Sequence, residues 1–180
     1  MFAREGIARA PMSEVAKNCG ISKANIYHYY SSKDSLLFDI LDSYLSSLTN
    51  HICNLPLDNL SAKDKLSAIT REVLFAYDGM DHQHKIQTEG LPLLRKEQQE
   101  ILKQYQRNMV AVVNDVLIEI VPPKIKHNRM VLRNINMSLF GMLNWYYIWN
   151  PNADRKAREE YAITITELTV SGAAHFEIIQ

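Results

Sequence analysis

The sequence predicts an all-α protein, with a small N-terminal helix-turn-helix head followed by an antiparallel helical bundle. Apolar residues recur at helical spacing along nearly the whole chain, with no sustained alternation of the kind that marks strands. Glycine and proline are sparse, six of each in 180 residues. They separate the periodic segments, as expected for residues that begin or end helices.

Length and composition indicate an ordinary soluble protein. A chain of 180 residues buries roughly 70% of its unfolded surface, which suits one domain, or one large domain with a small companion. No run of eighteen uncharged apolar residues predicts a membrane span, and no signal peptide is apparent. Cys19 and Cys53 form no disulfide framework or metal spacing and are expected to be buried or half-buried thiols. A cytoplasmic protein is expected.

The formal net charge is zero. This balance argues against a protein that coats nucleic acid through bulk positive charge. It is compatible with a small domain that reads DNA, because such a domain needs only a few well-placed cations.

The first helices are short. Residues 1–5 are expected to end a helix at Gly6, and a helix of five residues is not stable alone, so the natural chain is expected to begin earlier. Residues 12–19 place an apolar stripe on one helical face. Gly20 ends this helix, Ile21 follows as a buried anchor, and Ser22 caps the next helix.

The second short helix contains the stretch "SKANIYHYYSSK", residues 22–33. Its helical phase places Ile21, Ile26 and Tyr30 on the inner side. The outer side carries Lys23, Ala24, Asn25, Tyr27 and His28.

The remaining helices follow from caps and stops. Ser31 and Asp34 resemble a capping box for a helix over residues 32–53. Ser61 and Asp64 cap another helix, ending near residue 77, and residues 79–92 are expected to be irregular or briefly helical. Long helices are predicted at 94–121, 125–149 and 154–177, the first stopped by prolines 122–123.

A short helix, a glycine turn and a second short helix follow the helix-turn-helix plan. In that plan the second helix enters the major groove of DNA. The amide and imidazole groups on its outer side can read base edges, and the hydroxyl and ammonium groups can bind phosphates.

The segment "MSEVAKNCGISKANIYHYYSSKDSLLFDIL" (12–41) resembles the DNA-binding head of the TetR (tetracycline-repressor-like) family of bacterial transcription regulators. The resemblance implies a DNA-binding domain at 1–48, a ligand-binding and dimerisation domain at 49–180, and a homodimer on a palindromic DNA operator. It implies base contacts by Asn25 and His28, with Lys23 and Ala24 nearby. Tyr27, Tyr29 and Lys33 occupy backbone-contacting positions.

Two departures from the family pattern concern the electrostatic attraction of the head for DNA. Ala10-Pro11 offers no hydroxyl where the family usually has Ser or Thr. The first helix is also mostly absent, and family members commonly carry basic residues there. Because residues 1–48 carry five cations and five anions, part of the electrostatic attraction for DNA is expected to lie in preceding sequence.

The last two predicted helices suit dimerisation. "LFGMLNWYYIWNP" (139–151) is apolar on nearly all sides, and "ITELTVSGAAHF" (165–176) contains small residues that allow close approach. Two such pairs across a twofold axis form a four-helix interface. The expected interface residues are Phe140, Leu143, Leu168, Gly172 and Phe176. The alternative is that one helix is central to a monomer's core.

The C-terminal region also resembles the acyl-CoA-responsive subgroup of the family, through Phe140-Gly141-Met142, Asn144-Trp145, Trp149 and the Glu159–Tyr161 region. The resemblance implies a repressor released from its operator by a small hydrophobic effector such as an acyl-CoA. Candidate pocket residues are Tyr105, Asn108, Met109, Val112, Met142 and Trp145. Ordinary core packing is the alternative for Tyr105 and Met109.

Other functions have less support. A multidrug-type regulator would bind flat cations among Trp145, Tyr146 and Trp149, but this segment lacks the buried carboxylate such pockets usually keep. An all-helical enzyme is the remote alternative, and no catalytic constellation is visible. His82 and His84 do not share a helix face, so no metal site is expected, and no cofactor is expected.

Overall fold

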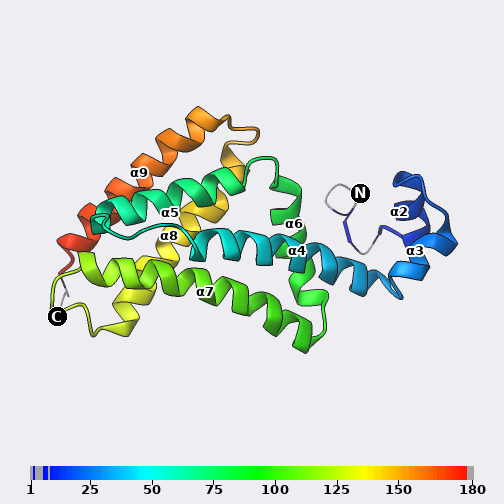
Figure 1. The fold of residues 1–180 in the computed structure, drawn as a ribbon, viewed down its shortest axis with the longest axis horizontal. Coiled ribbons are helices and arrows are strands. Elements are labelled where there is room, and N and C mark those ends of the chain that lie inside the picture. The colour runs from blue at the N-terminus through cyan, green and yellow to red at the C-terminus, as the bar shows by residue number, and fades with distance from the viewer. Residues whose placement is uncertain (1, 3–5, 8, 178–180) are drawn as a thin grey trace. The chain divides into compact units, whose positions relative to one another are not determined.

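A computed structural model of the chain describes residues 2, 6–7 and 9–177 (Figure 1). Within these residues the secondary structure is helical throughout, which confirms the predicted all-α fold. The described elements are α2 (Met12–Asn18), α3 (Lys23–Tyr29), α4 (Lys33–Cys53), α5 (Ala62–Ala76), α6 (Asp81–Gly90), a 3-10 turn η1 (Leu91–Leu93), α7 (Lys96–Ile120), α8 (Arg129–Trp149) and α9 (Arg155–Ala174).

The chain divides into two compact units. Unit 1 comprises Met1–Ser47 and Met80–Tyr105, and unit 2 comprises Leu48–Gly79 and Gln106–Gln180. Both α4 and α7 contribute residues to each unit. The inclusion of α6 and the first part of α7 in unit 1 was not predicted from the sequence.

The N-terminal helix expected over residues 1–5 falls largely on residues outside the described part of the chain. The predicted end of this helix, Gly6, lies within the described residues. Gly6 has φ +85°, in the left-handed region, and its N–H donates to the Phe2 carbonyl at 2.9 Å.

Helices α2 and α3 are joined by a tight turn at Gly20, which has φ +69°. Ser22 caps α3 as predicted, because its Oγ accepts a hydrogen bond from the Asn25 N–H at 3.0 Å. The predicted burial of Ile21 is wrong, since its side chain is 37% exposed. Ile21 is held through its backbone N–H, which donates to the Ala16 carbonyl at 3.0 Å.

The cap of α4 lies one residue later than predicted. Ser32 and Ser35 form a reciprocal pair, in which each hydroxyl accepts a hydrogen bond from the other residue's N–H at 3.1 Å. The expected pair of Ser31 and Asp34 is therefore wrong. Because α4 begins at Lys33, Ser32 is the residue in the capping position.

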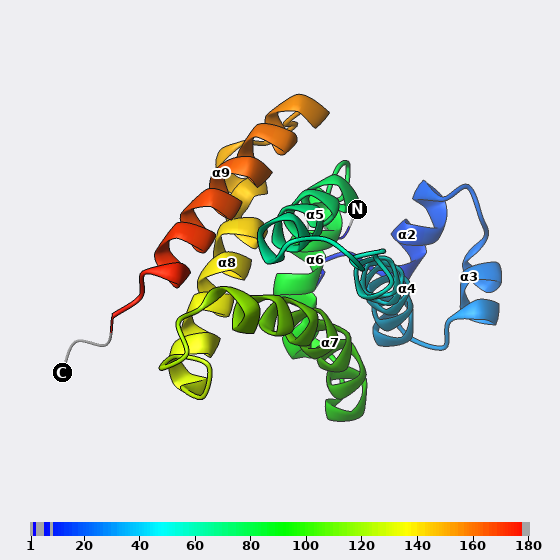
Figure 2. The same ribbon diagram turned by 60° about the vertical axis from the view of Figure 1, so that its left-hand side comes forward.

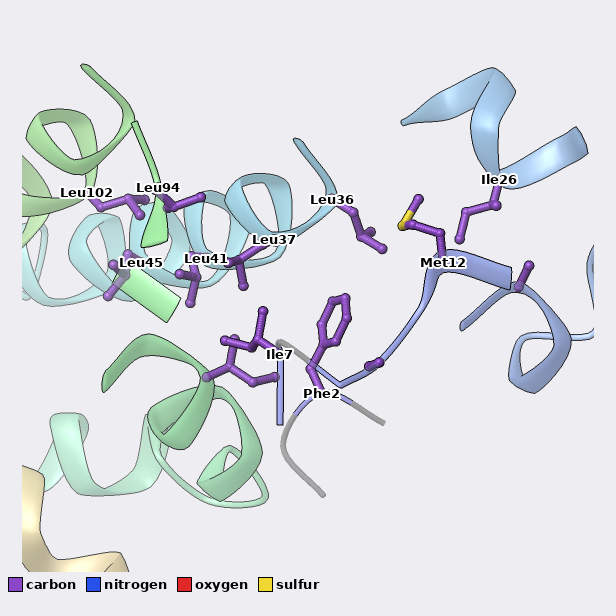
Figure 3. Packing of buried hydrophobic residues seen from close by; sticks show 13 residues of the cluster. Phe2, Ile7, Met12, Ile26, Leu36, Leu37, Leu41, Leu45, Leu94 and Leu102 are labelled. Atoms are coloured by element: carbon purple, nitrogen blue, oxygen red, sulfur yellow. The ribbon is translucent and has the colours of Figure 1, made fainter. Parts of the chain in front are cut away.

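The core of unit 1 joins α4 to α2 and α3 (Figure 3). In this cluster Leu37, Leu41 and Leu45 are at most 1% exposed. Burying a Leu side chain contributes about 1.5–3 kcal/mol, so this row stabilises the platform that carries α3. The cluster also includes Phe2, Ile7, Ala10, Met12, Ala16, Ile26, Leu36, Ile86, Leu94 and Leu102.

The segment expected to be irregular or briefly helical forms α6, a helix of ten residues. Its last residue, Gly90, is buried against unit 1 residues. On the same helix His84 is buried, and its Nε2 lies 3.1 Å from the Tyr44 hydroxyl of α4 in a hydrogen bond.

Unit 2 is built on the packing of α5 and α8 against α9, and Figure 2 shows α8 and α9 side by side. The hydroxyls of Thr70 in α5 and Thr166 in α9 lie 2.8 Å apart in a buried hydrogen bond. Helix α8 is tied to α7 by Asn136, whose Nδ2 donates to the Val110 carbonyl at 2.9 Å.

Both cysteines are exposed, so the predicted burial of Cys19 and Cys53 is wrong. Cys19 follows the last residue of α2, where the backbone leaves the helix, and Cys53 is the last residue of α4. Among the described residues, no helix is long and apolar enough to cross a membrane.

Candidate nucleic-acid interface and ligand-binding surfaces

Helix α3 presents a continuous polar and aromatic surface. Ile26 is the buried residue of the helix. The reading face, as we define it, consists of six exposed residues: Lys23, Ala24, Asn25, Tyr27, His28 and Tyr29. The structure thus brings six of the seven predicted DNA-contacting residues together on one short helix.

Aromatic contacts order this face. The Lys23 ammonium lies 5.9 Å from the centroid of the Tyr27 ring, within the range of a cation–π contact. The His28 and Tyr29 rings meet edge to face, with centroids 5.3 Å apart. Tyr29 is nevertheless 71% exposed, so its hydroxyl is accessible to a partner.

Tyr30 lies outside the reading face and supports it from behind. Its hydroxyl donates to Asp39 Oδ2 of α4 at 2.6 Å. This hydrogen bond, with burial and the charge of Asp39, raises the pKa of the Tyr30 phenol. Tyr30 therefore links the C-terminal end of α3 to α4.

Lys33, the seventh predicted contact, lies at the start of α4 and is half-buried. Its Nζ donates to the Ile7 carbonyl at 2.8 Å. This bond engages the Lys33 ammonium within unit 1. The lysine also ties α4 to the N-terminal segment, a role the sequence did not indicate.

The predicted dimer residues divide into two groups. Phe140 and Leu143 are buried among the residues of unit 2. Leu168, Gly172 and Phe176 are exposed, Leu168 at 61%. These last three line an open apolar groove of about 280 Å³ between α8 and α9, with Ile135 and Met142 of α8.

The candidate effector residues are dispersed. Met109 is buried, Val112 and Met142 are half-buried, and Asn108 is exposed. Trp145 is 63% exposed. Tyr105 belongs to unit 1, where burial, followed by a hydrogen bond to Asp42, raises its pKa. Met142 is the one of these six that lines the apolar groove between α8 and α9, and none of the six lines the cavity between α7 and α8.

The second cavity, of about 390 Å³, lies between α7 and α8 and was not predicted. Four cations line it: Arg107 from α7, Lys126 from the preceding loop, and Arg129 and Arg133 from α8. We call it the basic cavity. Arg129 and Arg133 are four residues apart and share a helix face, which is the one signal that the sequence carries.

A buried cation lies beneath the aromatic segment of α8. Arg158 is 2% exposed, and its guanidinium donates to the carbonyls of Ala153 at 3.1 Å and Leu74 at 3.2 Å. It lies 5.8 Å from the centroid of the Tyr146 ring. Tyr146 stacks on Tyr161 with centroids 4.4 Å apart. The guanidinium is also paired with Asp78, whose Oδ1 lies 3.5 Å from Arg158 Nη2, so the buried cation beside Tyr146 already has a carboxylate partner.

Across the part of the chain that the structure describes, no three His, Cys, Asp or Glu side chains gather as a metal site. The buried His84 is hydrogen-bonded to Tyr44.

Two family models match the chain. Residues 1–40 match "Bacterial regulatory proteins, tetR family", and residues 59–173 match "Tetracyclin repressor-like, C-terminal domain". The first match contains α2 and α3, and the second extends from the residues before α5 to the end of α9.

Among curated proteins, the chain is 31% identical over 106 residues to YerO of Bacillus subtilis (strain 168), an uncharacterized HTH-type transcriptional regulator. The match spans 58% of the chain and 36% of YerO, so the chain covers about a third of that relative.

Among solved structures, a TetR-family transcriptional regulator from Bordetella parapertussis 12822 is similar with a TM-score of 0.86 at 27% identity. That likeness covers 99% of this chain and 93% of the other. AibR in complex with isovaleryl coenzyme A and operator DNA is similar with a TM-score of 0.74 at 19% identity, covering 93% and 90%. At this identity the likeness to AibR establishes the shared fold. From its sequence matches and its architecture, the chain belongs to the TetR family of bacterial regulatory proteins.

Proposed function

We propose that the protein is a DNA-binding transcriptional repressor that reads a palindromic operator as a homodimer. The reading face of α3 is the observation that carries this proposal. Asn25 and His28 are exposed and carry amide and imidazole groups that can read base edges. Tyr27, Tyr29 and Lys33 hold the backbone phosphates on either side.

The homodimer forms through the exposed apolar surface of α8 and α9. On α9, Leu168 and Gly172 border the apolar groove. A contiguous apolar surface of this kind is typical of a protein interface. Pairing this surface across a twofold axis buries it and places two copies of α3 on one operator, whose half-sites lie about 34–36 Å apart.

The effector is an acyl-CoA, which binds in the C-terminal domain and releases the operator. AibR, which has the same fold, is known in complex with isovaleryl coenzyme A and operator DNA. The multidrug alternative has less support because the ionised group buried beside Tyr146 is the Arg158 guanidinium, and the carboxylate near it, that of Asp78, is 61% exposed and already paired with this guanidinium. An effector releases DNA only if it binds the DNA-free conformation more tightly.

The test is a titration of the protein–operator complex, with the operator first isolated by selection from random duplexes. Acyl-CoAs of several chain lengths are added while fluorescence anisotropy reports the bound DNA. We expect release by acyl-CoAs and little effect of free CoA, which lacks the apolar chain. Release by an aromatic cation, with no acyl-CoA active at any length, would replace this effector class with the multidrug one.

A further inference from the structure

We propose that the basic cavity between α7 and α8 binds the phosphate-bearing end of the effector. This inference rests on the proposed function for the identity of the ligand. The site itself is argued from the residues that line the cavity: Arg107, Lys126, Arg129, Arg133, Asp115 and Asn136.

The charge of the cavity selects an anion. Four cations and one carboxylate give a formal lining charge of +4 − 1 = +3. Within the described part of the chain, the side chains of Lys126, Arg129 and Arg133 form no ion pair with a carboxylate. Arginine guanidinium groups bind both carboxylate and phosphate oxygens in a bidentate manner. The excess of three positive charges favours phosphate groups, which carry more negative charge than a single carboxylate.

A buried amide supplies the second, independent observation. Asn136 is 1% exposed, lines the cavity, and its Oδ1 has no hydrogen-bond partner. The orientation of the amide is set by its Nδ2, which donates to the Val110 carbonyl at 2.9 Å. Leaving a buried acceptor unpaired costs about 1–3 kcal/mol, and a ligand N–H or O–H would satisfy it.

The two observations together define the ligand chemistry. The ligand carries phosphate groups and, beside them, an amide N–H or a hydroxyl. Coenzyme A has both, because its phosphates adjoin a pantetheine arm with two amides and a hydroxyl. A cavity of about 390 Å³ holds only part of such a molecule, so the remainder extends beyond it.

The experiment is calorimetric titration of the full chain with decanoyl-CoA, free CoA and decanoic acid. The double variant Arg129→Ala/Arg133→Ala should bind the two CoA compounds about tenfold more weakly, a loss of about 1.4 kcal/mol in binding free energy. Its affinity for decanoic acid should be unchanged. The matched control Lys63→Ala/Lys156→Ala removes two exposed cations of unit 2 that lie outside the cavity, and it should bind like the wild type. Asn136→Asp places a negative charge in the cavity and should also weaken CoA, with circular dichroism confirming its fold.

Failure of the site and failure of the proposed effector are distinguishable. Suppose that decanoyl-CoA releases the operator, but the Arg129→Ala/Arg133→Ala and Lys63→Ala/Lys156→Ala variants bind decanoyl-CoA with equal affinity. The basic cavity is then not the phosphate site. If acyl-CoAs release no operator but free CoA still binds and depends on Arg129 and Arg133, the cavity is a phosphate site and the effector assignment is wrong. If neither decanoyl-CoA nor free CoA binds in the calorimeter, the inference is wrong.

Discussion

Gly90 at the end of α6 packs directly against Leu37 of α4: a Cβ atom on Gly90 would lie 3.1 Å from one methyl carbon of Leu37. It would also lie 2.9 Å from Cδ1 of Ile7. Both distances are shorter than ordinary van der Waals contact. The glycine therefore allows α6 to approach the core that supports α3.

We expect Gly90→Val to destabilise the protein by about 1–3 kcal/mol, because added methyl groups overpack a well-packed core. Urea unfolding followed by circular dichroism measures the change. Gly141→Ala is the matched control, since a Cβ there meets no atom within 4 Å, and it should stabilise by about 0.5–1 kcal/mol. Equal unfolding midpoints for the Gly90 variant and the wild type would contradict the close packing.

The dimer surface predicts a second result. Gly172 is exposed and a Cβ on it meets open space within the protomer, so Gly172→Glu should leave the protomer folded. It should place two unpaired charges at the twofold interface and yield monomers in sedimentation velocity. Gly172→Ala, which adds a methyl group without charge, should remain a dimer. A stable dimer of the Glu variant would place the interface elsewhere.

Burial of Tyr77 predicts a loss of stability at alkaline pH. The Tyr77 phenol donates to Asn144 Oδ1 at 2.8 Å, and burial raises its pKa well above the ordinary value of 10.0. A folded-state pKa above the unfolded one means that the contribution is complete below pH 10. It decreases as pH rises above 10, because unfolding then releases a proton.

Denaturant unfolding between pH 8 and pH 11 measures this dependence. Tyr77→Phe should lose part of the alkaline slope, and the rest should persist through Tyr30, Tyr105 and Tyr161, whose pKa values are also raised. An unchanged slope in the variant would show that the Tyr77 phenol titrates alike in both states.

The features predicted well from the sequence depend on neighbouring residues. Gly20 ends α2 through its own left-handed backbone conformation. Ser22 begins α3 through a hydrogen bond to the N–H of Asn25, three residues later. The helical phase of α3 then determines that Ile26 is buried and the reading face exposed. Each of these features is decided within one or two helical turns.

The features predicted poorly depend on tertiary packing. The burial of Phe140 and the exposure of Trp145 depend on which side of α8 faces α5 and α9, and both sides are apolar in sequence. The basic cavity joins residues from α7 and α8 that are up to 29 positions apart, from Arg107 to Asn136. Helical periodicity contains no information about such pairings.

The most direct test of the account is whether α3 reads sequence. Wild-type protein and the variants Asn25→Ala and His28→Ala are titrated with the selected operator and with a scrambled duplex at fixed salt. Each variant should lose about 1–3 kcal/mol for the operator and little for the scrambled duplex. His127→Ala removes an exposed histidine outside the head and should bind like the wild type. Retention of full operator preference by both reading-face variants would contradict the assignment of α3 as the recognition helix.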